Sequence, residues 1–248
     1  MIVAVWKANY EVYGTRKLWH ALRRAGEDVG RDQVGRLMRE LGICGVRRGR
    51  PSRTTIADAG ASRAPDLVNR HFSAAGPNRL WVTDLTYVPT QAGTAYVCFV
   101  VDVFSRMIVG WRVATNMATA MVLDALDMAH ARRRGGLAGL VCHSDAGSQF
   151  TSIRFGERLT EFEAVPSIGS VGDSYDNAMA ETVNGLYKTE LIGRGTPWSN
   201  ADAVELATLQ WVHWFNTERL HSALGYVSPR EFEQAHYRHR ADDLVGIQ

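Results

Sequence analysis

The sequence of 248 residues predicts an α/β fold, in which a mixed sheet with flanking helices follows a small all-helical domain. Residues 80–114 contain three runs rich in Val, Ile and aromatic residues, which are typical of strands. Helix and strand patterns then alternate as far as residue 192. Residues 1–70 hold two short helix patterns and carry 14 Lys/Arg residues against 7 Asp/Glu, whereas the remainder carries 14 against 19. A basic helical head therefore precedes an acidic body, and such a head is typical of proteins that bind nucleic acid.

Two amphipathic helices are predicted in the head. Residues 15–25 and 31–41 each repeat apolar side chains at intervals of three and four, which marks one face of a helix. Residues 26–30 include two glycines and interrupt the pattern, so residues 1–48 are predicted to form a helix-turn-helix domain whose second helix enters the DNA major groove. The candidate DNA contacts off the buried stripe of that helix are Arg31, Gln33, Arg36 and Arg39. A helical hairpin that binds nothing is the alternative.

A basic linker is predicted over residues 49–76, because this stretch lacks apolar periodicity. The arginines around the junction of the two segments, Arg47, Arg48 and Arg50, are suited to phosphate contacts, whose energy comes from released counterions and does not depend on DNA sequence. The alternative is an ordinary solvated surface.

A larger α/β domain with a C-terminal helical tail is predicted over residues 77–237, followed by a flexible C-terminus at 238–248. Its first three strands are joined by turns too short for parallel crossovers, so they form an antiparallel meander. The predicted elements are strands at 80–89, 94–103 and 106–114, a helix at 117–131, a strand at 139–143, a helix around 155–162, a strand at 164–168, and helices at 175–192 and 203–215. This order is that of a ribonuclease-H-like fold.

Composition excludes several other classes of protein. No apolar run approaches the roughly 18 residues that a membrane span needs, so we expect no membrane association and a cytoplasmic location. The three cysteines, Cys44, Cys98 and Cys142, fit neither a disulfide framework nor a paired-thiolate zinc site.

Three acidic residues occupy positions in or next to predicted strands and helices that suggest a role other than packing. Asp84 lies in mid-strand on the face shared by Val82 and Thr86, where a bare carboxylate is costly. Asp145 follows the strand 139–143, at the edge where α/β sheets gather ligands, and Glu181 lies one turn inside a predicted helix. Oxygen ligands of this kind favour Mg²⁺, with Mn²⁺ as a substitute, and two such ions serve phosphodiester chemistry. Each acid also has a structural alternative: an arginine partner, a turn cap or a solvated helix position.

Three motifs together resemble the catalytic core of the retroviral-integrase-like transposases, and more narrowly the second-reading-frame subunit of the insertion-sequence-three family. Thirty-five residues separate Asp145 from Glu181, and Lys188 follows seven positions after Glu181. The motifs are Trp81-Val82-Thr83-Asp84-Leu85-Thr86-Tyr87, His143-Ser144-Asp145-Ala146-Gly147-Ser148-Gln149-Phe150, and Ser170-Val171-Gly172-Asp173-Ser174-Tyr175-Asp176-Asn177-Ala178 followed by Glu181. The resemblance extends over residues 10–237.

The resemblance implies that Asp84, Asp145 and Glu181 are the metal-binding catalytic triad, holding two Mg²⁺ or Mn²⁺ ions, and that Lys188 contacts transposon-end DNA. It also implies end cleavage by water, attack of the freed 3′-hydroxyl on another phosphodiester, and assembly of a homo-oligomer on DNA. Such subunits are made as fusions to an upstream reading frame, so we expect an upstream partner or fusion here. Ala146 departs from the family, in which this position is often Arg.

The expected function is therefore that of a DNA transposase performing metal-dependent cleavage and strand transfer. Two alternatives stay open: a ribonuclease-H-like nuclease that cuts without joining, and a truncated, non-catalytic DNA-binding remnant or regulator.

Overall fold

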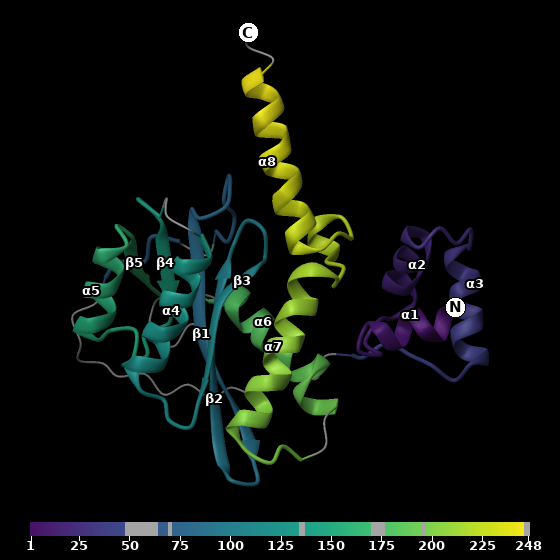
Figure 1. The fold of residues 1–248 in the computed structure, drawn as a ribbon, viewed down its shortest axis with the longest axis horizontal. Helices are drawn as coiled ribbons and strands as arrows, with labels where there is room; N and C mark the ends of the chain where they lie inside the picture. The colour runs from purple at the N-terminus through teal and green to yellow at the C-terminus, as the bar shows by residue number, and fades with distance from the viewer. Residues whose placement is uncertain (48–63, 69–70, 134–136, 170–176, 195–196, 246–248) are drawn as a thin grey trace.

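A computed structural model describes most of the chain (Figure 1). The described residues are 1–47, 64–68, 71–133, 137–169, 177–194 and 197–245. Of the predicted site residues, Arg48 and Arg50 lie outside these ranges, as does most of the Ser170–Ala178 motif.

A five-stranded mixed sheet forms the centre of the larger domain, in the order β3-β2-β1-β4-β5. The strands are β1 (Leu80–Thr90), β2 (Gly93–Asp102), β3 (Ile108–Ala114), β4 (Val141–Ser144) and β5 (Val165–Ile168). β1, β2 and β3 are antiparallel, whereas β4 and β5 run parallel to β1. The predicted meander and the mixed sheet are both confirmed.

Helices cover both faces of this sheet, because alternate residues of each strand point to opposite faces (Figure 1). On one face Trp81 packs in a core with α4 (Thr119–Arg133) and α5 (Ile153–Glu161). On the other, Val82 packs in a core with α6 (Ala178–Glu190) and α7 (Ala201–Thr217). Since Asp84 has the same parity as Val82, it belongs to the α6 face.

The contact between α4 and β3 is made by backbone. A Cβ atom built on Gly110 of β3 would lie 2.0 Å from the carbonyl oxygen of Ala125 in α4. Only glycine fits this position, and the close approach fixes α4 against the sheet.

Three helices make up the N-terminal domain: α1 (Ile2–Ala8), α2 (Thr15–Arg24) and α3 (Arg31–Glu40). The predictions for α2 and α3 are confirmed, and their apolar stripes are buried at Leu18, Leu22, Val34 and Met38. The sequence analysis missed α1, which has seven residues and buries none of them.

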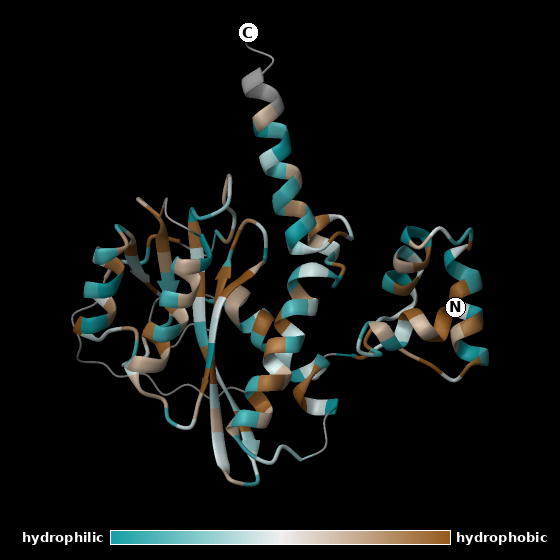
Figure 2. Cartoon of the chain, viewed as in Figure 1, coloured by the Kyte–Doolittle hydropathy of each residue, from teal (hydrophilic) through white to brown (hydrophobic). Residues whose placement is uncertain are grey.

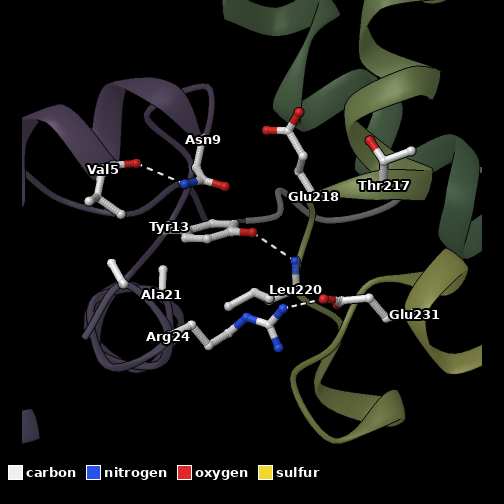
Figure 3. Close-up of a pocket in the computed structure, with 10 residues that line it drawn as sticks. Val5, Asn9, Tyr13, Ala21, Arg24, Thr217, Glu218, Leu220 and Glu231 are labelled. Carbon is white, nitrogen blue, oxygen red and sulfur yellow. Dashed lines mark hydrogen bonds and ion pairs between the residues drawn. The ribbon is translucent and has the colours of Figure 1, made fainter. Parts of the chain in front are cut away.

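The N-terminal domain docks against the end of α7 and the segment that follows it (Figure 3). The backbone N–H of Leu220 donates a hydrogen bond to the hydroxyl of Tyr13, 2.7 Å away, and Arg24 forms an ion pair with Glu231. A cavity of about 310 Å³ lies between the two parts and is lined in part by Tyr13, Arg24, Glu218 and Glu231. The ring centroids of Tyr10 and Trp214 are 4.8 Å apart, so the two domains meet through aromatic packing as well as polar contacts.

The last helix, α8 (Pro229–Val245), extends past residue 237, where the predicted larger domain ends, so residues 238–245 of the predicted flexible C-terminus are helical. It projects from the rest of the molecule, and beyond its first turns it carries mostly hydrophilic residues, unlike α7 (Figures 1 and 2). None of the helices in the described ranges has the length and apolar character needed to cross a bilayer.

Candidate active site

Two of the predicted acids lie next to each other because their strands are parallel neighbours. In the register between β1 and β4, Thr83 is opposite Ser144. Asp84 and Asp145 are each the next residue along, so both directly follow the last pair of the β1–β4 ladder, although β1 itself continues to Thr90. Neighbouring strands are about 4.8 Å apart, which brings the two carboxylates within electrostatic reach of each other.

The carboxylate of Asp84 is held by neutral donors. Its Oδ1 accepts a hydrogen bond from the backbone N–H of Leu85 at 2.8 Å, and its Oδ2 accepts one from the side-chain amide of Asn184 at 2.9 Å. Burial, together with the negative charges of Asp145 and Glu181, raises the pKa of Asp84 to about 8. This acid therefore lies in a pocket of like charge that favours its protonated form.

Asp145 begins the turn after β4. Its Oδ1 accepts a hydrogen bond from the backbone N–H of Gly147 at 3.1 Å. Burial raises the pKa of Asp145, while this hydrogen bond and the nearby His143 act in the opposite direction. The turn thus holds this carboxylate at the end of β4.

Helix α6 contacts β1 at Thr83 and Asp84 through side-chain hydrogen bonds. The side-chain amide of its N-cap residue, Asn177, donates to the carbonyl of Thr83 at 2.9 Å, and Asn184 binds Asp84 one helical turn after Glu181. Glu181 is exposed and lies in the first turn of α6. The predicted helix began at residue 175, but α6 begins at Ala178, because Asn177 has a non-helical backbone conformation.

Lys188 lies further along the same face of α6. Its Nζ is 4.5 Å from the centroid of the Tyr87 ring on β1. Burial lowers the pKa of Lys188, and the charge of Asp84 acts in the opposite direction. We call Asp84, Asp145 and Glu181 the acid edge. The exposed Lys188 ammonium lies in the electrostatic field of its member Asp84.

Asn184, which contacts Asp84, and Tyr87, which contacts Lys188, were given no role in the sequence analysis. The signal for Asn184 was its spacing of three from Glu181, which places both on one helix face. Its Oδ1 is buried and has no hydrogen-bond partner among the described residues, so an unsatisfied acceptor lies beside the carboxylates.

The donor set is suited to a hard divalent cation, although the side chains are not drawn together around one point. Among the residues that the structure describes, no three His, Cys, Asp or Glu side chains are grouped closely enough to hold a metal ion. The donors of Asp84, Asp145 and Glu181 are all carboxylate oxygens, which Mg²⁺ and Mn²⁺ prefer. Burial and the charges of Asp145 and Glu181 raise the pKa of Asp84, and a bound cation would offset both effects.

The predicted DNA contacts of the head are exposed on α3, in a domain separate from the acids (Figure 1). Two of the arginines form exposed ion pairs, Arg31 with Asp32 at 2.9 Å and Arg36 with Glu40 at 3.3 Å. Exposed pairs of this kind are weak, so they do not prevent contact with phosphate. A groove beside α3 is lined in part by Arg31, Arg39 and Arg47, and Gln33 is exposed as well.

Comparison with known families divides the chain as the structure does. Residues 2–51 match the family described as HTH-like domain. Residues 74–174 and 164–229 match two families that are each described as integrase core domain.

The chain is also similar over nearly its whole length to transposases. It is 55% identical to a transposase for insertion sequence element IS986/IS6110 of Mycobacterium tuberculosis (strain ATCC 25618 / H37Rv), over 99% of this chain and 90% of that protein. It is 50% identical to the transposase for IS629 of Shigella sonnei, over 98% and 80%. With the transposase for IS904 of Lactococcus lactis subsp. lactis, identity is 35% over 94% and 92%.

Among solved structures, a chain in the simian T-cell lymphotropic virus intasome, in complex with PP2A regulatory subunit B56 gamma, matches with a TM-score of 0.54. Identity is 14%, over 94% of this chain and 74% of that one, so the likeness concerns the fold alone and confirms the predicted ribonuclease-H-like architecture. The chain belongs to the insertion-sequence-three type of transposases, in which an HTH-like domain precedes an integrase core.

Proposed function

We propose that this transposase cleaves a phosphodiester bond at the end of its DNA element and joins the freed 3′-hydroxyl to target DNA. The observation that carries the proposal is the shared edge of β1 and β4, where Asp84 and Asp145 lie next to each other and Glu181 is near enough to raise the pKa of Asp84. Like charges are brought together at a cost, which a catalytic site repays by binding a cation.

Asp84, Asp145 and Glu181 would hold two divalent ions, Mg²⁺ or in its place Mn²⁺. When bound, such ions activate a water or hydroxyl nucleophile and stabilise the leaving oxygen at phosphorus. The fit is supported by the all-oxygen donor set and by the unsatisfied Oδ1 of Asn184 beside it.

The chain's own side chains would orient the reacting groups. Asn184 and the backbone of Leu85 hold the carboxylate of Asp84 through two hydrogen bonds, and Gly147 holds that of Asp145. Lys188, on the same face of α6, would bind a phosphate of the element's end. The scheme requires no Ser, Tyr or Cys nucleophile and no covalent protein–DNA intermediate.

The N-terminal domain would bind DNA through the exposed face of α3 and the start of the linker. The proposed contacts are Arg31, Gln33, Arg36, Arg39, Arg47, Arg48 and Arg50. Assembly of several copies on DNA, and an upstream-frame partner or fusion, belong to the same proposal.

The test is incubation with Mg²⁺ and labelled duplex oligonucleotides that carry the two ends of the DNA element encoding the chain. Nicking at the end together with a joined product is the expected result. Nicking without joining would instead identify a nuclease, and a gel shift without either product would identify a non-catalytic regulator.

A second test concerns the linker arginines. Replacing Arg47, Arg48 and Arg50 with Ala should weaken binding of these oligonucleotides and reduce the slope of log affinity against log salt by about one per lost phosphate contact. An unchanged slope would assign the three arginines to an ordinary solvated surface.

A further inference from the structure

An exposed aromatic ring lies further along β1 than Asp84 and contacts Lys188 of α6. Tyr87 lies on β1, three residues after Asp84, and is 44% exposed. Tyr96 lies opposite it in the antiparallel register with β2. The ladder that pairs β1 with β4 ends at Thr83, and Trp198 forms an isolated bridge with Thr90 at the far end of β1, so Tyr87 lies between these two contacts.

The face of the Tyr87 ring contacts the ammonium group of Lys188, a residue of α6. The Nζ of Lys188 lies 4.5 Å from the ring centroid, within the range of a cation–π interaction. No carboxylate forms an ion pair with Lys188 in the part of the chain that the structure describes. The ammonium is therefore held in place by a neutral ring and keeps its charge available for an anion.

This arrangement addresses a physical problem of lysine. Its side chain is long and flexible, and fixing it costs conformational entropy. A ring that attracts the ammonium reduces the number of positions available to Lys188 before a ligand arrives, and preorganisation of this kind improves affinity. An acidic partner would fix the side chain equally well, but it would also compete with a phosphate for the charge.

We infer that Tyr87 is a positioning residue, which holds the Lys188 ammonium beside Asp84 so that it meets a phosphate of the DNA end. The inference rests on the proposed function, because it assigns a DNA phosphate to Lys188. Tyr87 acts through Lys188 and forms no contact of its own with the DNA.

The test is a double-mutant cycle with Tyr87→Leu, Lys188→Met and the double variant. Binding of the duplex end oligonucleotide is measured by fluorescence anisotropy without divalent metal, at several salt concentrations. Tyr87→Leu should weaken binding about threefold, the scale of one exposed cation–π contact. Tyr87→Phe, which keeps the ring face, should bind as the parent does.

The decisive comparison is made in the Lys188→Met background, where Tyr87→Leu should have no further effect. An equal loss in both backgrounds would show that Tyr87 contacts DNA directly and would overturn the inference, as would parental affinity of Tyr87→Leu in the Lys188 background. Tyr237→Leu, which removes an exposed tyrosine of α8, is the matched control, and thermal unfolding confirms that each variant is folded. Nicking by the parent protein tests the proposed function separately from this cycle.

Discussion

Two carboxylates that belong to α6 or contact it, Glu190 and Asp84, have opposite electrostatic surroundings. At the C-terminal end, the buried Glu190 receives a guanidinium: Nε of Arg219 donates to its Oε2 at 2.9 Å, and both side chains are almost fully buried. In the middle of α6, Asn184 donates an amide hydrogen bond to Asp84 of β1; the other donor to this carboxylate in the described part of the chain is a backbone N–H, and the nearby Asp145 and Glu181 have the same charge. The structural carboxylate of Glu190 is neutralised by Arg219 of the same chain. The acid edge, in contrast, is suited to a counter-charge from a bound cation.

The largest expected effect lies at the paired end. Arg219→Met leaves Glu190 buried without its partner, which should lower the free energy of unfolding by about 3–5 kcal/mol. The measurement is urea unfolding at pH 7. Arg36→Met, which breaks only the exposed pair with Glu40, is the matched control and should cost about 0.5 kcal/mol or less. Equal losses in the two variants would contradict the contrast.

The acid edge should respond in the reverse sense. Asp84→Asn should reduce the rate of end nicking by about a hundredfold or more, while the free energy of unfolding without metal stays the same or rises, because a like charge is removed. Gel quantification of nicked DNA and urea unfolding check the two halves. An Asp84→Asn protein that nicks at the parental rate would rule out the assigned site.

A smaller effect is expected from the neutral donor. Asn184→Ala removes the hydrogen bond to Oδ2 of Asp84 and should weaken Mn²⁺ binding about tenfold, the lower end of the range for residues that orient metal ligands. Titration calorimetry measures this change. If affinity stays within about twofold of the parent, Asn184 has no such role.

The smallest effect concerns pH. The pKa of Asp84 rises from an ordinary 3.8 to about 8 in the folded chain, so the folded state binds this proton more tightly than the unfolded state. The resulting stability is complete below pH 3.8 and is lost as the pH rises through about 8. Without metal, the parent should lose about 1 kcal/mol more than Asp84→Asn between pH 5 and pH 8.5, given solvent screening. Parallel pH profiles of the two proteins would contradict this.

Much of the sheet could be predicted because the polarity of its residues indicates whether they are buried. The runs that became β1, β2 and β3 are apolar on both faces, and the turns between them leave only an antiparallel arrangement. Asp84 stood out for the same reason, since a charge within such a run needs a special explanation. The position of Asp145 followed from the general rule for parallel strands.

Other features depend on contacts between distant residues and were not predictable. Helix α1 is too short to show a period and gains its structure by packing its partly buried face on neighbours. In α8 polar residues occupy most of the surface, so its periodicity is weak. The pairing of Glu190 with Arg219 and of Tyr13 with Leu220 joins segments whose proximity only the folded chain establishes.

The central claim is that Asp84, Asp145 and Glu181 together bind divalent cations. Its most direct test is a count of Mn²⁺ bound to the full chain, by titration calorimetry with electron paramagnetic resonance of the free ion. The account predicts two ions in the parent and a loss of affinity of about tenfold or more in each of Asp84→Asn, Asp145→Asn and Glu181→Gln. A triple variant that still binds two Mn²⁺ ions with parental affinity would contradict it.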